Sequence, residues 1–293
     1  MFYRQRILLA LIDANDGKIQ NTNLQKLLFL FCQETGESYY DFFPYKYGAF
    51  SFLSYYDKRK LTEKGYLKDV VQFELAGGIP YLKQLKPGDQ SQILAFMTRY
   101  KHLRNRQLIR KTYLEYPEYA LRSEIVDQML TPSEKEAVQS AWRQETSPVL
   151  FTIGYEGKSI DKYLRQLAFN NITTLVDVRR NPFSHKHGFS KRDLQRYLKS
   201  LGIRYIHTPE LGVESALRKN LNGKASYEAL FEQYATHTLP KQERTLNMIL
   251  NLIDRYSRVA LTCFEATPEM CHRHKVAYAL QGIPAFSCPI VHI

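Results

Sequence analysis

Residues 261–275, LTCFEATPEMCHRHK, concentrate side chains that can do chemistry. They hold two of the chain's four cysteines, two of its eight histidines, an arginine and two glutamates. A thiolate is a nucleophile or a ligand for soft metal ions, and an imidazole is a base or a ligand. The pattern therefore indicates a reactive thiol, a metal site or only a crowded junction between a strand and a helix.

The reactive-thiol hypothesis depends on where a helix begins. Thr267 is a suitable N-cap and Pro268 suits the first helical position, so a helix is expected over 268–280. The positive end of that helix and Arg273 would lower the pKa of Cys271. We therefore expect Cys271, or else Cys263, to act as a nucleophile or ligand, and Cys271 to be alkylated quickly.

The metal hypothesis needs several ligands that converge on one point. Cys263, Cys271, His272 and His274 are the soft candidates, but the chain has no C-x2-C knuckle here. If Cys271 and His272 are both helical, their adjacent side chains should diverge. The expectation is therefore no metal ion, no other cofactor and no stoichiometric zinc.

The elements that would position these residues alternate between strand and helix after a polar, proline-containing stretch at 143–148. We expect a helical domain over 1–146 and an α/β domain over 147–293. The expected strands are 149–153, 174–178, 204–207, 258–263 and a short one near 288–291, and the expected helices are 159–167, 191–201, 226–235, 240–256 and 268–280. This alternation predicts a mainly parallel sheet covered on both faces.

Ligands of such sheets bind at the carboxyl ends of the strands, where the polar side chains of this domain follow. We expect one shared pocket there. Its catalytic candidates are Asp177 and Glu210 as general acid or base, together with Cys263, Cys271 and His272. Its substrate- or anion-binding candidates are Gly154, Tyr155, Glu156, Gly157, Arg179, Arg180, Ser184 and Arg273.

The charge of the chain indicates a polyanionic partner. The net charge is +12, and residues 151–293 carry +8 of it, from 20 Lys and Arg against 12 Asp and Glu. The basic stretch 181–191, NPFSHKHGFSK, has Phe183 and Phe189 as candidates for stacking on a base. We expect DNA, RNA or a phosphorylated nucleotide as partner, and homo-oligomer formation stays open.

The remaining composition indicates a cytoplasmic protein with reduced thiols. Four cysteines do not make a disulfide scaffold in a chain of 293 residues. No stretch approaches the roughly 18 apolar residues that a membrane span needs, and the N-terminus lacks the features of a signal peptide.

The first domain has the order of a winged helix. Helices are expected at 4–13, from 21 to Gly36, and from Ser51, followed by a hairpin formed by 67–75 and 79–85 and by further helices from 87 to 143. LQKLLFLF and FPYKYGAFSFLSYYDKRKLTEKGYL resemble small bacterial winged-helix-like domains associated with toxin–antitoxin or defence genes. Ala49 stands where that pattern usually has proline.

The second domain is similar to a family of its own. TIGYEG, LVDVRRNPFSHKHGFSK, YIHTPELG and LTCFEATPEMCHRHKVA resemble the bacterial and archaeal domain of unknown function 488 family, in order over nearly all of 149–293. The resemblance implies a compact α/β domain and names no reaction.

Two functional hypotheses follow from these features. The first is an enzyme, a hydrolase or a transferase, that acts on a nucleotide or nucleic acid at the strand-end pocket. The second is a non-enzymatic DNA-binding regulator or defence component, whose α/β domain senses a ligand and whose helix at 51–64 carries the cations for DNA.

Overall fold

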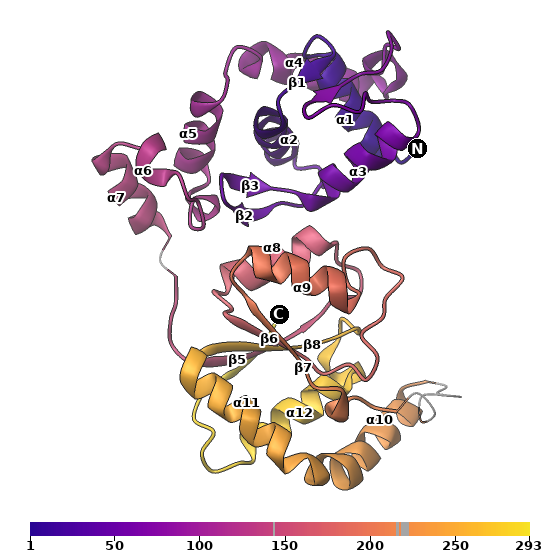
Figure 1. The fold of residues 1–293 in the computed structure, drawn as a ribbon, viewed down its shortest axis with the longest axis vertical. Helices are drawn as coiled ribbons and strands as arrows, with labels where there is room; N and C mark the ends of the chain where they lie inside the picture. Colours follow the sequence, from indigo (N-terminus) through magenta and orange to yellow (C-terminus); the bar gives the residue numbers. More distant parts are fainter. Residues whose placement is uncertain (143, 215–216, 218–222) are drawn as a thin grey trace. The chain divides into compact units, whose positions relative to one another are not determined.

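The computed structural model describes residues 1–142, 144–214, 217 and 223–293 (Figure 1). The chain forms two compact units, Met1–Arg143 and Gln144–Ile293. Arg143, the first residue of the expected linker, lies outside the described residues. No helix in the described ranges is both long and apolar enough to cross a membrane.

The first unit is mainly helical, as the sequence predicts. Its α-helices are α1 (Tyr3–Asp13), α2 (Asn21–Thr35), α3 (Phe52–Glu63), α4 (Pro87–Tyr100), α5 (Arg106–Glu115), α6 (Val126–Met129) and α7 (Pro132–Ala141). Gly36 ends α2 in the left-handed conformation, and Ser51 caps α3 by accepting a hydrogen bond from the amide of Ser54. Two short antiparallel pairs join β1 (Lys18–Ile19) to β4 (Phe73–Glu74) and β2 (Phe43–Tyr45) to β3 (Gly48–Phe50).

The expected hairpin of the first unit is not formed as predicted. A single bridge joins Leu67 to Leu75, and β4 pairs with β1 instead of with residues 79–85. Pro80 has no amide hydrogen for a ladder, and the next residues turn into a 3₁₀ helix, Leu82–Gln84. The amide of Leu82 donates to the Asp13 carboxylate at 3.0 Å, which fixes this turn against α1.

The second unit is an α/β fold with a five-stranded parallel sheet, as predicted. Its strands are β5 (Val149–Gly154), β6 (Thr174–Asp177), β7 (Arg204–His207), β8 (Arg258–Cys263) and β9 (Ile290–His292). The spatial order is β7-β6-β8-β5-β9, and every pair is parallel. Each residue of β5 and of β8 is buried, which is typical of central strands covered on both faces.

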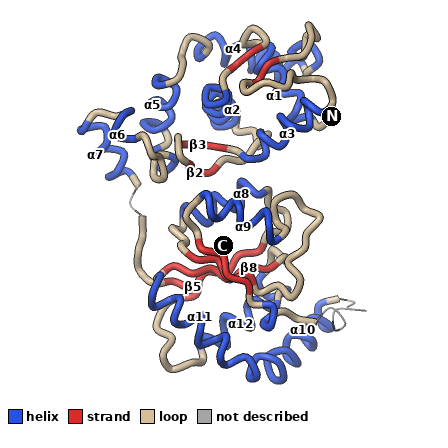
Figure 2. The backbone as a smooth tube through the Cα atoms, viewed as in Figure 1, coloured by secondary structure: helices blue, strands red, loops and turns tan. Residues whose placement is uncertain are grey.

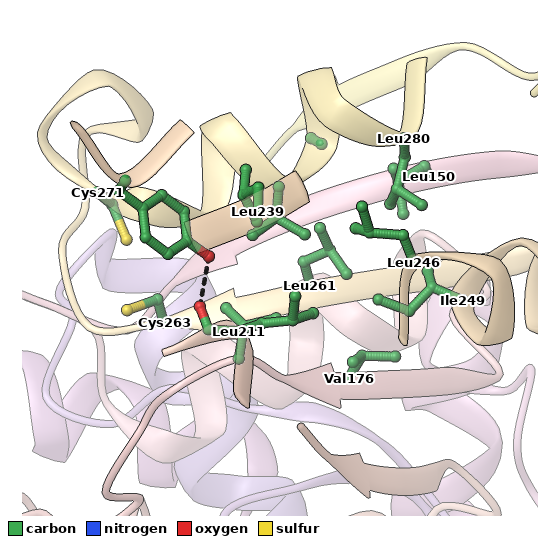
Figure 3. Close-up of a cluster of buried hydrophobic side chains, with 14 of the residues drawn as sticks. Leu150, Val176, Leu211, Leu239, Leu246, Ile249, Leu261, Cys263, Cys271 and Leu280 are labelled. Carbon is green, nitrogen blue, oxygen red and sulfur yellow. Dashed lines mark hydrogen bonds between the residues drawn. The ribbon is translucent and has the colours of Figure 1, made fainter. Parts of the chain in front are cut away.

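Helices cover the two faces of this sheet. Figure 2 shows α8 (Ile160–Phe169) and α9 (Lys191–Ser200) on one face, and α11 (Glu243–Tyr256) and α12 (His272–Gln281) on the other, with α10 (Lys224–Gln233) on the same side as α11. The apolar residues between α11, α12 and the sheet form one buried cluster, which includes Leu150, Val176, Leu261, Cys263 and Cys271 (Figure 3).

The strand ends that matter for function lie side by side. Gly154 of β5 is in register with Cys263 of β8, and Asp177 of β6 is in register with Thr262 of β8 and with His207 of β7. The chain leaves β6 toward one face of the sheet and β8 toward the other. This reversal between neighbouring strands is the kind of place where α/β sheets bind ligands.

Candidate functional site

A buried ion pair occupies the end of β6. Asp177 is fully buried and Arg179 is 5% exposed. One carboxylate oxygen of Asp177 accepts hydrogen bonds from Arg179 N and Nε at 3.1 and 2.8 Å, and the other accepts from Arg179 Nη2 at 2.5 Å and from Tyr205 Oη at 2.6 Å. Arg179 Nη1 donates to Tyr155 Oη at 2.9 Å and to the carbonyl of Phe189 at 3.0 Å. Both charges are therefore paired inside the protein.

The electrostatics of this pair favour its charged form. Burial lowers the pKa of Arg179, but the hydrogen bonds and the charge of Asp177 raise it more, so that the net pKa is raised. Burial and then the charge of Asp177 raise the pKa of Tyr205, which keeps its hydroxyl a donor. Arg179, expected to bind phosphate, and Asp177, expected to act as an acid or base, are both hydrogen-bonded to internal partners, and the two roles stay predictions.

Gly154 and Arg273 hold the loop that follows β8. A Cβ atom on Gly154 would lie 1.8 Å from the carbonyl oxygen of Glu265, so only glycine permits this approach. Arg273 is fully buried, and its two terminal nitrogens donate to the carbonyls of Glu265 and Ala266. The guanidinium of Arg273, which was expected to bind an anion, is buried and binds the carbonyls of this loop; its role in anion binding stays a prediction.

Residues 155–157, the rest of the GYEG segment, also contact the loop that follows β8. The amides of Tyr155 and Glu156 donate to the carbonyl of Phe264 at 3.0 and 2.9 Å. The carboxylate of Glu156 accepts from the amide of Ala266 at 2.9 Å. Gly157 has a positive φ of 70°, which completes the turn into α8. These amides bind a neighbouring carbonyl, where an anion was expected.

Cys263, Cys271 and His272 come together at the end of β8. Within the described part of the chain, they form a group whose Sγ and ring-nitrogen atoms all lie within 4.8 Å of one another. His272 Nδ1 lies 3.7 Å from Cys263 Sγ and 4.0 Å from Cys271 Sγ. Figure 3 shows the two cysteines at the same end of the buried cluster. All three residues are at most 1% exposed.

The start of the last helix differs from the prediction, and this explains the convergence. Residues Pro268–Met270 form a 3₁₀ turn, and Cys271 is the N-cap of α12 with an extended backbone. His272 is the first helical residue, so helical geometry does not force the adjacent side chains apart. The argument that Cys271 and His272 must diverge is therefore wrong.

The expected lowering of the Cys271 pKa is corrected. Burial raises the pKa of the Cys271 thiol well above its ordinary value, and neighbouring Cys263 and Glu265 raise it further, against the smaller opposing effect of Arg273. The free thiol is therefore neutral and enclosed at neutral pH. A buried neutral thiol is a poor target for alkylation.

The loop between β6 and α9, residues 180–190, lies partly on the surface. Arg180 is exposed and its Nη1 lies 3.4 Å from the carbonyl of Pro209. Ser184 is half-buried: its amide donates to Ser190 Oγ at 3.0 Å and its hydroxyl accepts from the amide of Lys186 at 3.1 Å. Of the predicted anion-binding residues, Arg180 is the one with an exposed guanidinium.

Glu210 contacts a different residue from those of the buried groups. It is in the short 3₁₀ helix Pro209–Leu211, is half-buried, and accepts a hydrogen bond from Thr245 Oγ1 at 2.9 Å. The described contacts do not join it to the cysteines or to Asp177.

Two buried groups, the Asp177–Arg179 pair and the Cys263–Cys271–His272 group, lie next to each other at the carboxyl edge of the sheet. His272 Nε2 donates to the carbonyl of Val178 at 2.9 Å, and Val178 lies between Asp177 and Arg179 in the chain. The predicted site list missed Tyr205 and Glu265. Tyr205 begins the segment YIHTPELG and Glu265 lies two residues after Cys263 in LTCFEATPEMCHRHKVA, so the family resemblance was a signal that could have found both.

The comparisons with known proteins concern this unit. Residues 159–280 match the model of the family described as Domain of unknown function DUF488. The match extends from the start of α8 to nearly the end of α12, and therefore includes both buried groups. No curated protein matches the chain, and no solved structure does.

Proposed function

We propose that this protein acts on nucleic acid and that its C-terminal unit binds a single strand through the loop between β6 and α9. The observation that carries the proposal is Phe183, whose side chain is 61% exposed on a basic loop. Its ring meets that of His185 edge to face, with centroids 4.9 Å apart. An exposed aromatic ring among cations is a platform on which an unpaired base can stack.

Cations lie on both sides of Phe183 in the sequence. Arg180, Lys191 and Arg192 are exposed, and Lys191 Nζ lies 3.2 Å from His207 Nδ1. Lys186 is more enclosed: its Nζ donates to the carbonyl of Tyr155 at 3.1 Å, and burial lowers its pKa. The exposed cations suit phosphates, since each contact releases counterions from the strand.

The loop is held in shape from beneath, which supports its use as a binding surface. Phe189 is fully buried and stacks on Tyr155 with centroids 4.4 Å apart, so Phe183 is the stacking candidate of the two. Arg179 holds the carbonyl of Phe189, and the amide of Lys191 donates to the carbonyl of Pro182 at 2.9 Å. A loop that is ordered before binding loses less conformational entropy on binding.

Binding has more support than catalysis at this edge. The thiols and Asp177 are enclosed and committed to internal contacts, and Glu210 bonds to Thr245. A general acid or base needs access to the proton it transfers. We therefore assign the buried strand-end residues to support of the loop.

The alternative of a DNA-binding regulator has less support from the first unit. The winged-helix interpretation needs a recognition helix with free cations, and α3 is the candidate. Lys58 Nζ donates to the carbonyls of Val70 and Val71, while Arg59 and Lys60 both pair with Glu63. These three cations gain less from a phosphate contact because they are already paired, whereas Lys64, the fourth cation expected on this helix, is exposed.

Fluorescence anisotropy of the full chain with a labelled DNA or RNA strand of roughly 16 nucleotides tests the proposal. Phe183→Ala should weaken binding about 5- to 150-fold, the equivalent of about 1–3 kcal/mol of stacking. Lys191→Gln should make the dependence of log K on log salt shallower by about 0.7. Arg255→Gln, which removes an exposed charge from α11 on the other face of the sheet, is the matched control. Binding that is absent at low salt, or equal losses in all three variants, would refute the proposal.

A further inference from the structure

We infer that Cys263, Cys271 and His272 form a binding site for one zinc ion. Two thiols and one imidazole nitrogen, contributed by the end of β8 and the start of α12, point into a common space within the protein. These three side chains differ from those of the proposed nucleic-acid surface, so zinc binding does not depend on nucleic-acid binding.

The separations of the three atoms fit tetrahedral zinc. Bonds of about 2.3 Å to sulfur and about 2.05 Å to nitrogen, at tetrahedral angles, place the sulfur and nitrogen ligands about 3.5 Å apart. The observed separations of His272 Nδ1 from the two sulfurs are 3.7 and 4.0 Å. Both nitrogen–sulfur separations therefore lie within about half an ångström of the tetrahedral value, and the two sulfur atoms lie within 4.8 Å of each other.

The second nitrogen of His272 is anchored as in a metal ligand. Nε2 lies 2.9 Å from the carbonyl oxygen of Val178, which only accepts hydrogen bonds. Nε2 must therefore carry the proton, and the lone pair of the neutral ring is on Nδ1, facing the thiols. A backbone carbonyl bound to the far nitrogen is the usual outer contact of a zinc-binding histidine, because it fixes both the tautomer and the ring orientation.

The carboxylate of Glu265 lies close to one of the three ligand atoms and is the candidate for a fourth ligand. Cys263 Sγ is 3.4 Å from Glu265 Oε2, and Glu265 belongs to the loop held by Gly154 and Arg273. We assign Glu265 as the residue that completes or orients the coordination, directly or through a water molecule. The hydrogen bonds of Arg273 to the carbonyls of Glu265 and Ala266 thus set the position of Glu265.

The ligand set selects the metal. Thiolates and imidazole favour zinc over the hard ions magnesium and calcium, which need oxygen ligands. The burial of both cysteines and His272 indicates a structural site that joins β8 to α12. Through Val178, the same site supports the strand that leads into the exposed loop.

Zinc analysis of the full chain, purified under reducing conditions without chelators, tests the inference. We expect about one zinc per chain. Cys263→Ser and Cys271→Ser should each lose most of it, while Cys288→Ser, a half-buried cysteine of the same unit, should keep it. Glu265→Gln should weaken zinc binding and leave the thiolate ligands in place. Zinc kept in both Cys263→Ser and Cys271→Ser would overturn the assignment.

A second measurement does not require the variants to fold. Replacement of zinc by cobalt in the unmodified chain should produce intense thiolate-to-cobalt bands in the near ultraviolet and tetrahedral bands in the visible region. A reduced chain with neither zinc nor these bands at saturating cobalt would refute the site. A Cys263–Cys271 disulfide that persists under the same reducing conditions would also refute it.

Discussion

Breaking the Asp177–Arg179 pair by removal of one partner should cost more stability than breaking an exposed ion pair of the C-terminal unit. In Asp177→Asn the shape is kept, but a carboxylate that accepts four hydrogen bonds becomes a neutral amide with one acceptor oxygen. Arg179, at 5% exposure, is then a buried cation without a counterion. Loss of one partner from a buried ion pair costs about 3–5 kcal/mol.

Hydrogen-exchange mass spectrometry of the full chain measures this cost locally, without separation of the two units. Some amides of β6 and β8 should exchange only when the whole unit unfolds. Because about 1.4 kcal/mol corresponds to a tenfold change, a loss of about 3–5 kcal/mol should make these amides exchange more than about a hundredfold faster in Asp177→Asn. Arg196→Gln is the control, because Arg196 pairs with Asp193 at 3.1 Å on the exposed surface of α9. Its effect should stay within about 1 kcal/mol.

A further variant separates loss of the pair from loss of packing. Asp177→Leu combined with Arg179→Met removes both charges, and it should recover much of the stability lost in Asp177→Asn. If Asp177→Asn changes exchange in β6 and β8 by less than about tenfold, the pair is not a major stabilising contact and the reasoning fails.

Two other predictions concern packing and pH. Gly154→Ala should lower the stability of its unit by about 1–3 kcal/mol or more, because the new methyl group would lie 1.8 Å from a backbone carbonyl oxygen. Gly282→Ala is the control: the nearest atom to its new methyl group is 3.5 Å away, so its thermal unfolding should be almost unchanged. Equal melting temperatures for the two variants would contradict this. Burial lowers the pKa of Lys26 to about 7 from 10.5, so above about pH 7 the unfolded chain binds a proton that the folded chain lacks. The free energy of unfolding of the first unit should therefore rise by up to about 1.4 kcal/mol for each pH unit. Lys26→Met should remove this contribution. If urea unfolding between about pH 7 and pH 9 gives the same pH dependence of stability for the variant and the unmodified chain, the prediction is excluded.

The sequence predicted the elements of the second unit because its signals are local. Continuous apolar runs such as VLFTIG, separated by helical segments and glycine or proline, are sufficient to indicate buried parallel strands. The strand-end rule then predicted which part of the sheet would gather the polar residues. Among those residues, Asp177, Arg179 and the Cys263, Cys271 and His272 group do lie at neighbouring strand ends.

The first unit shows where local signals were insufficient. Residues 79–85 carry the alternation of a strand, but Pro80 removes an amide hydrogen and Asp13, distant in the sequence, binds the next turn. The partner of β4 is β1, which precedes it by more than fifty residues. A contact of such range is decided by packing, and the alternation of a short segment does not reveal it.

What the sequence by itself determined is which residue types lie at the strand ends, and that the second unit is α/β. Only the tertiary structure decided what these residues contact. Arg179 and Arg273 look the same in a sequence as arginines that bind phosphate, yet burial forces each to find internal acceptors. Likewise, one extended residue at Cys271 turns two neighbouring side chains toward the same point. Burial and backbone direction are properties of the folded chain, and these two properties separate a supporting residue from a binding one.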